Sequence, residues 1–493
     1  MKKKLNEEYE NLIQIIEKRI RESTATWQMA LSTFLTLLLV VCISVNPRIL
    51  PLHQTAGIII LYILVYYFLF VYLCGYRATG EKLNNNEVYL LSGLTALYFI
   101  SAKLCKLHLS EYMPGSIAIP TALVIMLISI MINSRIAKIM GLILPFGVFV
   151  AGFYDLYSYL FALTSGISAA YVLHDARRRM DMVKAGLIVG IINIITTSAI
   201  FMAHNAYASA YPVVVFWAAM NGIASGMLVL GITPVLENLL HSATTFKLIE
   251  LLDLGAPLMR QLAQKTPGTF NHSMLVANLA EEACMRIGAR SLLARVGAYY
   301  HDIGKIDQPE YFVENQHNDN KHDDLNPRLS ATVIRSHVKL GIEKGRAIGL
   351  PNEVIDIIAS HHGNSLIAYF YNEAIKKEGE VNREDFCYPG NPPRTKEAAV
   401  VMLADVTEAA VRTLDKPGVS RLEKFVNELI AKKVDAEQLA DSELTFRELE
   451  IIKKVFVRVL ASYYHSRIDY PKISDPGEKT QNSPDSQKAE NNE

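Results

Sequence analysis

The chain has 493 residues, 51% of them hydrophobic, and its mean hydropathy of +0.18 is high for a wholly soluble protein. Its 49 basic and 49 acidic residues balance to a net charge of zero, which excludes the strongly basic domain of an indiscriminate nucleic-acid binder, so we expect no nucleic-acid polymer as a partner. The five cysteines form no CxxC pair, which argues against a disulfide scaffold and a thiolate zinc site.

Residues 1–26 are polar and charged, so they do not form a cleavable signal peptide, and we expect a cytoplasmic N-terminal tail. Residues 27–238 form apolar runs that approach the roughly 20 residues needed to cross a bilayer, which predicts a membrane domain of about eight helices. The third and fifth runs are short, and the fifth and sixth are also compatible with one re-entrant pair around Asp155. The runs are Trp27–Val45, Ala56–Tyr76, Val88–Ala102, Gly115–Ser134, Ile139–Phe153, Leu156–Leu173, Met182–Ala203 and Tyr211–Val235.

Basic residues alternate between the predicted loops. The tail and every second loop after it carry clusters of lysine and arginine, whereas the intervening loops carry few. The pattern predicts eight spans, with both ends in the cytoplasm, in a multi-pass protein of the cell inner (plasma) membrane; seven spans is the alternative. The clusters are Lys2, Lys3, Lys4, Lys18, Arg19 and Arg21 in the tail, then Arg77 with Lys82, Arg135 with Lys138, and Arg177, Arg178, Arg179 with Lys184.

Ionisable residues inside the predicted spans would indicate a transport path, and they are sparse. Asp155 and His204 fall at the ends of apolar runs, and Glu237 falls where the last run ends. Polar residues at the depth of the lipid headgroups would explain all three positions. We therefore expect a membrane anchor or sensor rather than a transporter.

The second half of the chain has helical periodicity throughout and no run of strand alternation. We expect linker helices over residues 239–268, a cytoplasmic all-α bundle over 269–472 and a disordered polar tail over 473–493. The segment Lys376–Arg394, rich in glycine, proline and charge, is expected to be a surface loop. The fold class is therefore all-α, a polytopic helical membrane domain followed by a helical bundle.

Histidines occupy inward positions of several predicted helices. His301 and Asp302 end an amphipathic helix, although a lone His-Asp pair is a weak signal. The adjacent His361 and His362 follow the apolar face of a helix that begins near Pro351, and two neighbouring inward imidazoles have no good packing rationale.

Three further polar residues fall on apolar helix faces: His272, His337 and Asp405. An unpaired carboxylate at such a position has a desolvation cost, and a cation would remove it. Each residue alone is more often structural, but five inward histidines and two aspartates together indicate a metal site. Imidazole and carboxylate ligands suit Fe, Mn, Ni or Zn, and seven exceed the need of one ion, which favours two bridged ions and a phosphoester substrate.

These residues resemble the HD phosphohydrolase superfamily, and within it the seven-transmembrane HD subgroup of PgpH-type cyclic di-AMP phosphodiesterases. The similarity covers about Phe246–Tyr470 and continues into the membrane half through Gly231–Glu237. It rests on His272, His301-Asp302-Ile303-Gly304-Lys305, His337, His361-His362-Gly363 and Asp405, with support from Pro267–Ser273, Tyr311–Gln316 and Met402–Asp405.

The resemblance implies an HD domain with two divalent metal ions, iron or manganese. It implies that His272, His301, Asp302 and Asp405 hold one ion, that His337, His361 and His362 hold the other, and that Asp302 bridges them. It also implies that His301, Asp302 and Lys305 are catalytic, and that a bridging hydroxide opens cyclic di-AMP to linear pApA.

Two basic residues lie where the implied substrate needs phosphate contacts. Lys305 is three residues after Asp302, and Arg412 is seven residues after Asp405 on the same helix face. We expect both to bind the substrate, and a solvent-facing salt bridge is the alternative for either.

One feature departs from the subgroup, whose members place a large extracellular domain between the first two spans, whereas here only Asn46 to Thr55 separate them. The regulatory input is therefore not inferred from the resemblance. Another cyclic dinucleotide or nucleotide as substrate, and a nucleotide-sensing receptor without catalysis, are the alternative functions. The lipid bilayer is the expected partner of the first half, and a homodimer is left open.

Overall fold

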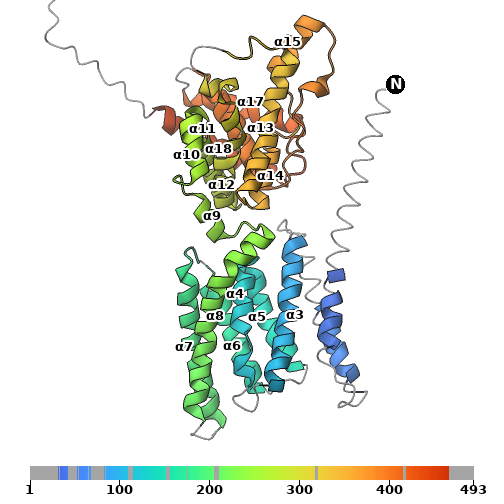
Figure 1. The fold of residues 1–493 in the computed structure, drawn as a ribbon, viewed down its shortest axis with the longest axis vertical. Helices are drawn as coiled ribbons and strands as arrows, with labels where there is room; N and C mark the ends of the chain where they lie inside the picture. Colours follow the sequence, from blue (N-terminus) through green and yellow to red (C-terminus); the bar gives the residue numbers. More distant parts are fainter. Residues whose placement is uncertain are drawn as a thin grey trace, which may run out of the picture.

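The computed structural model describes residues 31–32, 34–42, 53, 55–64, 66–67, 83, 85–108, 115–150, 156–174, 176–204, 210–316, 320–414 and 418–465. Over these ranges the chain is helical, and the single β-bridge pairs Leu366 with Cys387, which confirms the all-α prediction. The helices form two stacked parts, with α3 to α8 in one and α9 to α18 in the other (Figure 1). The predicted N-terminal tail and C-terminal disordered tail lie outside the described residues.

The first part is an apolar bundle. Its α3, α7 and α8 are long and apolar enough to cross a membrane, while Thr55–Leu64, α4 and α6 are shorter apolar helices. The predicted total of eight spans stays a prediction, because the structure describes the first two predicted runs only in part. The elements are α3 (Asn85–His108), η1 (Gly115–Ala118), α4 (Thr121–Met131), α5 (Ser134–Val150), α6 (Leu156–Val172), α7 (Met180–His204) and α8 (Tyr211–Leu240).

The bounds of three predicted runs were wrong. The run Ile139–Phe153 lies on α5, which already begins at Ser134. The run Val88–Ala102 is the middle of a longer helix, because polar residues at both ends of α3 continue its hydrogen bonding. The run Gly115–Ser134 is not one helix, since Pro120 separates η1 from α4. Proline restricts the residue before it to extended backbone, which ends the 3₁₀ turn. Asp155, around which a re-entrant pair was an alternative, lies outside the described residues.

The helices α7 and α8 meet backbone to backbone through facing glycines. A Cβ atom added to Gly222 would lie 2.3 Å from the Gly190 nitrogen, and one added to Gly226 would lie 2.6 Å from the Met182 oxygen. Small residues four apart let membrane helices approach this closely. The Asn221 amide then donates to the carbonyl of Ile117 at 2.7 Å, which ties η1 to this helix pair.

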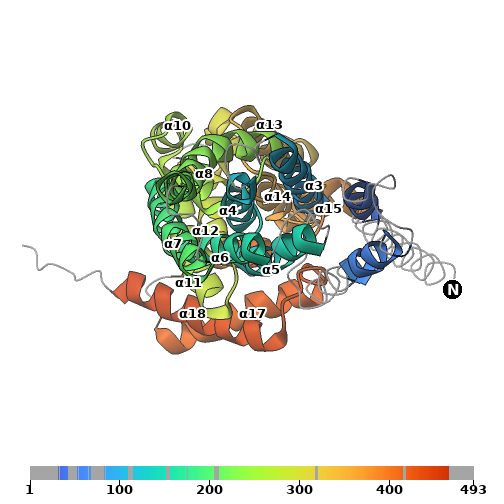
Figure 2. The same cartoon turned by 90° about the horizontal axis from the view of Figure 1, so that it is seen from below.

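The second part is a bundle around α11, which packs against α12, α16 and α18. Its core is built from fully buried aliphatic side chains, such as Val276, Val296 and Val400. Helices α17 and α18 lie along one side of this bundle (Figure 2). The helices are α9 (Thr245–Leu251), α10 (Pro257–Lys265), α11 (Pro267–Ile287), α12 (Ser291–Tyr300), α13 (Pro327–Ala347), α14 (Asn352–Ser360), α15 (Ala368–Glu378), α16 (Lys396–Val411), α17 (Val419–Asp435) and α18 (Phe446–His465), with 3₁₀ turns η2 (Ile303–Asp307), η3 (Pro309–Tyr311), η4 (Val313–Asn315) and η5 (Arg383–Phe386).

The segment expected to be a surface loop, Lys376–Arg394, is only partly so. It contains the end of α15 and the turn η5, and Phe386 within it is fully buried. The ring of Phe386 packs edge-on against Tyr371 of α15. This aromatic contact attaches the segment to the bundle, which glycine and proline content could not reveal.

Candidate metal centre

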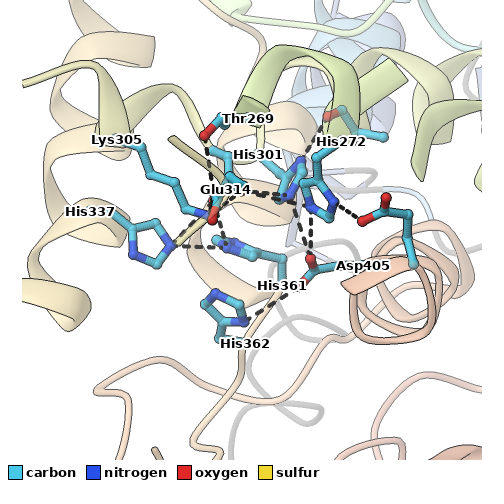
Figure 3. A network of polar contacts seen from close by, with 12 residues as sticks. Thr269, His272, His301, Lys305, Glu314, His337, His361, His362 and Asp405 are labelled. Atoms are coloured by element: carbon cyan, nitrogen blue, oxygen red, sulfur yellow. Dashed lines mark hydrogen bonds and ion pairs between the residues drawn. The ribbon is translucent and has the colours of Figure 1, made fainter. Parts of the chain in front are cut away.

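Five helices bring the predicted ligands to one place. His272 lies in the second turn of α11, His337 in the middle of α13 and Asp405 in the middle of α16. The short helices α12 and α14 end at the remaining ligands, with His301 and His361 as their C-cap residues. Six of these side chains converge in the interior of the bundle (Figure 3), and the seventh, Asp302, has ligand atoms within 4.8 Å of those of the five histidines.

The Asp302 carboxylate lies between two groups of histidines. One of its oxygens, Oδ1, is 3.4 Å from His337 Nε2 and 3.7 Å from His361 Nε2. The other, Oδ2, is 3.2 Å from His301 Nε2 and 3.9 Å from His272 Nε2. Two sets of ligand atoms therefore share Asp302, and within each set the atoms lie within 4.8 Å of one another. One set also contains His337, His361 and His362, and the other contains His272 and His301.

Backbone carbonyls fix the orientation of three of these imidazoles. The Nδ1 atoms of His301, His337 and His361 donate to the carbonyl three residues earlier, at 2.7, 2.6 and 2.7 Å. A proton held on Nδ1 leaves the Nε2 lone pair free to face the centre. His337 Nε2 and His361 Nε2 then lie 3.2 Å apart.

Two buried atoms at the centre, His301 Nε2 and Asp302 Oδ1, have no hydrogen-bond partner among the described residues. Unsatisfied polar atoms in a protein interior are costly. Both atoms carry lone pairs, and both face other atoms with lone pairs. A cation satisfies them, whereas a further hydrogen-bond acceptor would not. The donor set therefore fits metal ions.

The remaining ligands, His272, His362 and Asp405, meet on the α16 side. Asp405 Oδ1 is 3.0 Å from His272 Nε2 and 3.8 Å from His301 Nε2, and its Oδ2 is 3.5 Å from His362 Nδ1. His272 is oriented by a side chain, since its Nδ1 donates to the Glu408 carboxylate. Sequence reasoning missed Glu408, although it lies three residues after Asp405 on the same face of α16.

The buried histidines have pKa values set by opposing effects. Burial and then the charge of His301 lower the pKa of His361 to about 3, and burial also lowers the pKa values of His337 and His362. Burial alone would lower the pKa of His272 too, but its hydrogen bonds to Asp405 and Glu408 raise it to about 10.

The two aspartates are ionised. Burial raises the pKa of a carboxyl group, but His301 and Lys305 hold the pKa of Asp302 well below its usual range. Hydrogen bonding to His272 does the same for Asp405. The neutral imidazoles of His337, His361 and His362, opposite an ionised carboxylate, are in the protonation state that binds metal ions.

Lys305 and Arg412, the predicted phosphate contacts, both lie against carboxylates. Lys305 Nζ is 2.8 Å from Asp302 Oδ2 and 2.8 Å from Glu314 Oε1. Arg412 donates to both oxygens of Glu408, at 2.7 and 2.9 Å. Their contact with a substrate remains a prediction. In this structure Lys305 contacts the predicted ligand Asp302, and Arg412 contacts Glu408, the hydrogen-bond partner of His272.

A tyrosine also borders the centre. The Tyr388 ring stacks on the His362 ring with a centroid distance of 4.3 Å and an interplanar angle of 30°. Sequence reasoning missed Tyr388, because it lies in an irregular segment after η5, where no helical period marks an inward position.

Comparison with known protein families divides the chain at the same place as the structure. Residues 52–244 match the family described as 7TM receptor with intracellular HD hydrolase. Residues 269–410 match the HD domain family. The first match thus covers the apolar part of the chain, and the second covers the domain that holds the histidine and aspartate cluster.

Two curated relatives match over most of this chain. The cyclic-di-AMP phosphodiesterase PgpH of Bacillus subtilis is 37% identical over 83% of this chain and 58% of the relative. That of Listeria monocytogenes is 33% identical over 86% of this chain and 60% of the relative. The chain therefore spans about 60% of the length of these relatives. A solved structure, the L. monocytogenes PgpH HD domain in complex with cyclic-di-AMP, is 42% identical over 43% of this chain and 100% of that domain, with a TM-score of 0.42.

Proposed function

Because the chain belongs to the family of seven-transmembrane receptors with an intracellular HD hydrolase domain, we propose that it is a membrane-anchored, metal-dependent phosphodiesterase that hydrolyses cyclic di-AMP to linear pApA. The observation that carries this proposal is the Asp302 carboxylate, whose two oxygens face separate groups of buried histidines. Two relatives that match over most of the chain are named for activity on the same substrate.

The residues of the proposed centre would hold two divalent ions, manganese or iron. His272, His301 and Asp405 would hold one ion, His337, His361 and His362 the other, and Asp302, which faces both groups of histidines, would serve both. When bound, such ions supply positive charge that stabilises the transition state of phosphodiester cleavage and lowers the pKa of the attacking water.

The protein's own groups prepare this reaction. Lys305 holds one oxygen of Asp302 at 2.8 Å and fixes the angle of the carboxylate. The backbone carbonyls behind His301, His337 and His361 fix the ring tautomers. These contacts are in place before substrate binds, so little reorganisation accompanies the chemical step. We place this domain and both chain ends in the cytoplasm, at the inner face of the cell membrane.

The test uses the full chain, purified in detergent, loaded with manganese and offered cyclic di-AMP and cyclic di-GMP separately. We expect linear pApA from the first substrate and little product from the second, measured by chromatography. A protein that retains its metal but releases no product from either substrate would support a nucleotide-binding receptor and contradict the proposal. Preference for cyclic di-GMP would leave the reaction class intact and correct the substrate.

The His301→Ala and Asp302→Ala variants are expected to lose metal and turnover together, because each removes a ligand that no neighbour replaces. The matched control is Asp324→Asn, which changes an exposed carboxylate of the same domain. Metal content by elemental analysis and turnover are measured on the same samples. Turnover retained by either ligand variant contradicts its assigned role.

A further inference from the structure

The predicted metal ligands differ in exposure, and the two most exposed of them, Asp405 and His362, lie side by side. The side chains of His301, Asp302, His337 and His361 are at most 1% exposed. The side chains of Asp405 and His362 are 11% and 24% exposed. A substrate therefore approaches over the edge formed by Asp405 and His362.

Lys433, on α17, lies beside this open edge. Its Nζ atom donates to Ser365 Oγ at 2.8 Å. Ser365 is itself fixed to the edge, because its N–H donates to the carbonyl of His362 at 3.1 Å and its carbonyl accepts from the N–H of Tyr388 at 3.0 Å. The Asp405 carboxylate acts on Lys433 electrostatically, opposing the burial that lowers the pKa of the lysine. Lys433 is therefore a neighbour of the centre, although it lies beyond the residues that match the HD domain family.

Lys433 differs from the other two cations at the centre. Lys305 contacts Asp302 and Glu314, and Arg412 contacts Glu408. No carboxylate oxygen of the described residues lies within 4.0 Å of Lys433 Nζ. An ammonium group has three donors, and the hydroxyl of Ser365 uses one of them.

A half-buried ammonium with unused donors is matched by an anion arriving from solution. A cyclic dinucleotide carries two phosphodiester groups. The metal centre neutralises the one that is cut, and the second also loses water as the ring enters the site. Lysine acts on phosphate as a compact point charge and needs no planar alignment.

We propose that Lys433, held by Ser365, binds the second phosphodiester of a cyclic dinucleotide while the first lies on the metal centre. This inference rests on the proposed function. Such a contact would make the cleavage centre prefer a substrate with two phosphates over a simple phosphodiester.

The test compares full-length wild type with Lys433→Gln, using cyclic di-AMP and bis(4-nitrophenyl) phosphate, which has a single phosphodiester. Loss of one charge-assisted hydrogen bond is expected to raise KM for cyclic di-AMP about tenfold. The change in KM for the single phosphodiester should be several-fold smaller, and kcat on cyclic di-AMP should change less than KM. Lys433→Arg, which keeps the charge, should restore most of the affinity.

The matched control is Lys432→Gln, which removes a charge from the adjacent, exposed position of α17 and should leave both KM values at the wild-type level. Metal content is measured for every variant. If wild type cleaves the single phosphodiester but not cyclic di-AMP, the proposed function fails. If wild type cleaves both and Lys433→Gln leaves KM for cyclic di-AMP unchanged, or alters both substrates equally, the phosphate subsite is refuted while the proposed function stands.

Discussion

At the scale of single residues, the imidazoles of the centre are oriented in two different ways. His301, His337 and His361 use carbonyls of their own helices, which no side-chain substitution can remove. His272 uses Glu408, a side chain of another helix. The orientation of His272 is therefore the one that a substitution behind the ligand can disturb, and Arg412 holds Glu408 from its other side.

We expect Glu408→Ala to lower metal affinity about 10- to 100-fold, because partners behind a ligating histidine set its tautomer and ring angle. The measurement is competition with a graded series of chelators, read as bound metal per chain. The control is Glu428→Ala, an exposed glutamate on α17. An affinity equal to that of wild type would show that the helix alone orients His272.

The lowered pKa values of three histidines predict a stability loss in acid for the metal-free protein. His361 has a pKa of about 3 when folded and an ordinary value of 6.5 when unfolded, so between these values only the unfolded chain binds its proton. Stability therefore rises with pH in this window and is lost as pH falls below 6.5. His337 and His362 act in the same direction.

The pKa of His272 has the opposite effect in a different window. Because its folded pKa is raised to about 10, its contribution is complete below 6.5 and is lost as pH rises through 10. It therefore does not cancel the acid effect. We expect chelator-treated protein to unfold at a lower temperature at about pH 5 than at about pH 7; the reverse order would contradict neutral burial of the three histidines.

At the scale of elements, helical periodicity predicted the metal ligands on regular helices, but it missed Glu408 behind one of them and Tyr388 in an irregular segment. His361 and His362 were predicted because they continue the apolar face of α14, and the structure brings all seven predicted ligands together. Tyr388 could not be found this way, since its place depends on the packing of η5. Lys305 was expected to face substrate, yet it pairs with Glu314, whose 3₁₀ turn only the three-dimensional fold brings near.

The contact between η2 and α13 gives an element-scale prediction. A Cβ atom on Gly304 would lie 1.8 Å from the carbonyl oxygen of His337, so Gly304→Ala must push α13 away from the centre. We expect a loss of stability of about 2 kcal/mol and reduced metal content, since His337 moves with its helix. Thermal unfolding and elemental analysis measure the two effects.

The control for this change is Gly231→Ala on α8, where nothing lies within 4 Å of the added atom. In a helix interior alanine is favoured over glycine, so this variant should be as stable as wild type or slightly more so. Equal stability and equal metal content of the two variants would show that η2 and α13 can move apart at no cost.

At the scale of the whole molecule, a cluster of charges lies where the two parts shown in Figure 1 meet. Arg179, between α6 and α7, is 2.9 Å from the buried Glu237 of α8 and 2.7 Å from Glu250 of α9. Glu237 also accepts from the hydroxyl of Thr244, the N-cap residue of α9. The end of the apolar bundle is thus fixed to the first helix of the second part, and the Glu237 carboxylate is a buried ion-pair partner.

The short connection after α8 continues this link toward the metal centre. The carbonyl of His241 accepts from the N–H of Asn352, the first residue of α14, at 3.0 Å. The carbonyl of Ala243 accepts from Arg290, which directly precedes α12, at 2.6 Å. Both helices end at predicted metal ligands. Hydrogen bonds therefore connect the end of the apolar bundle to two helices whose ends carry predicted ligands.

We expect Arg179→Gln to loosen this connection, because among the described side chains it leaves the buried Glu237 carboxylate with the hydroxyl of Thr244 as its remaining hydrogen-bond partner. Removing one partner of a buried ion pair is destabilising, and local opening is expected to become at least about tenfold more frequent. Hydrogen exchange followed by mass spectrometry should then be faster across 241–256 and at the first turns of α12 and α14. The control is Arg178→Gln, whose side chain is exposed. Faster exchange confined to the membrane helices, or none at all, would show that the charge cluster does not connect the two parts.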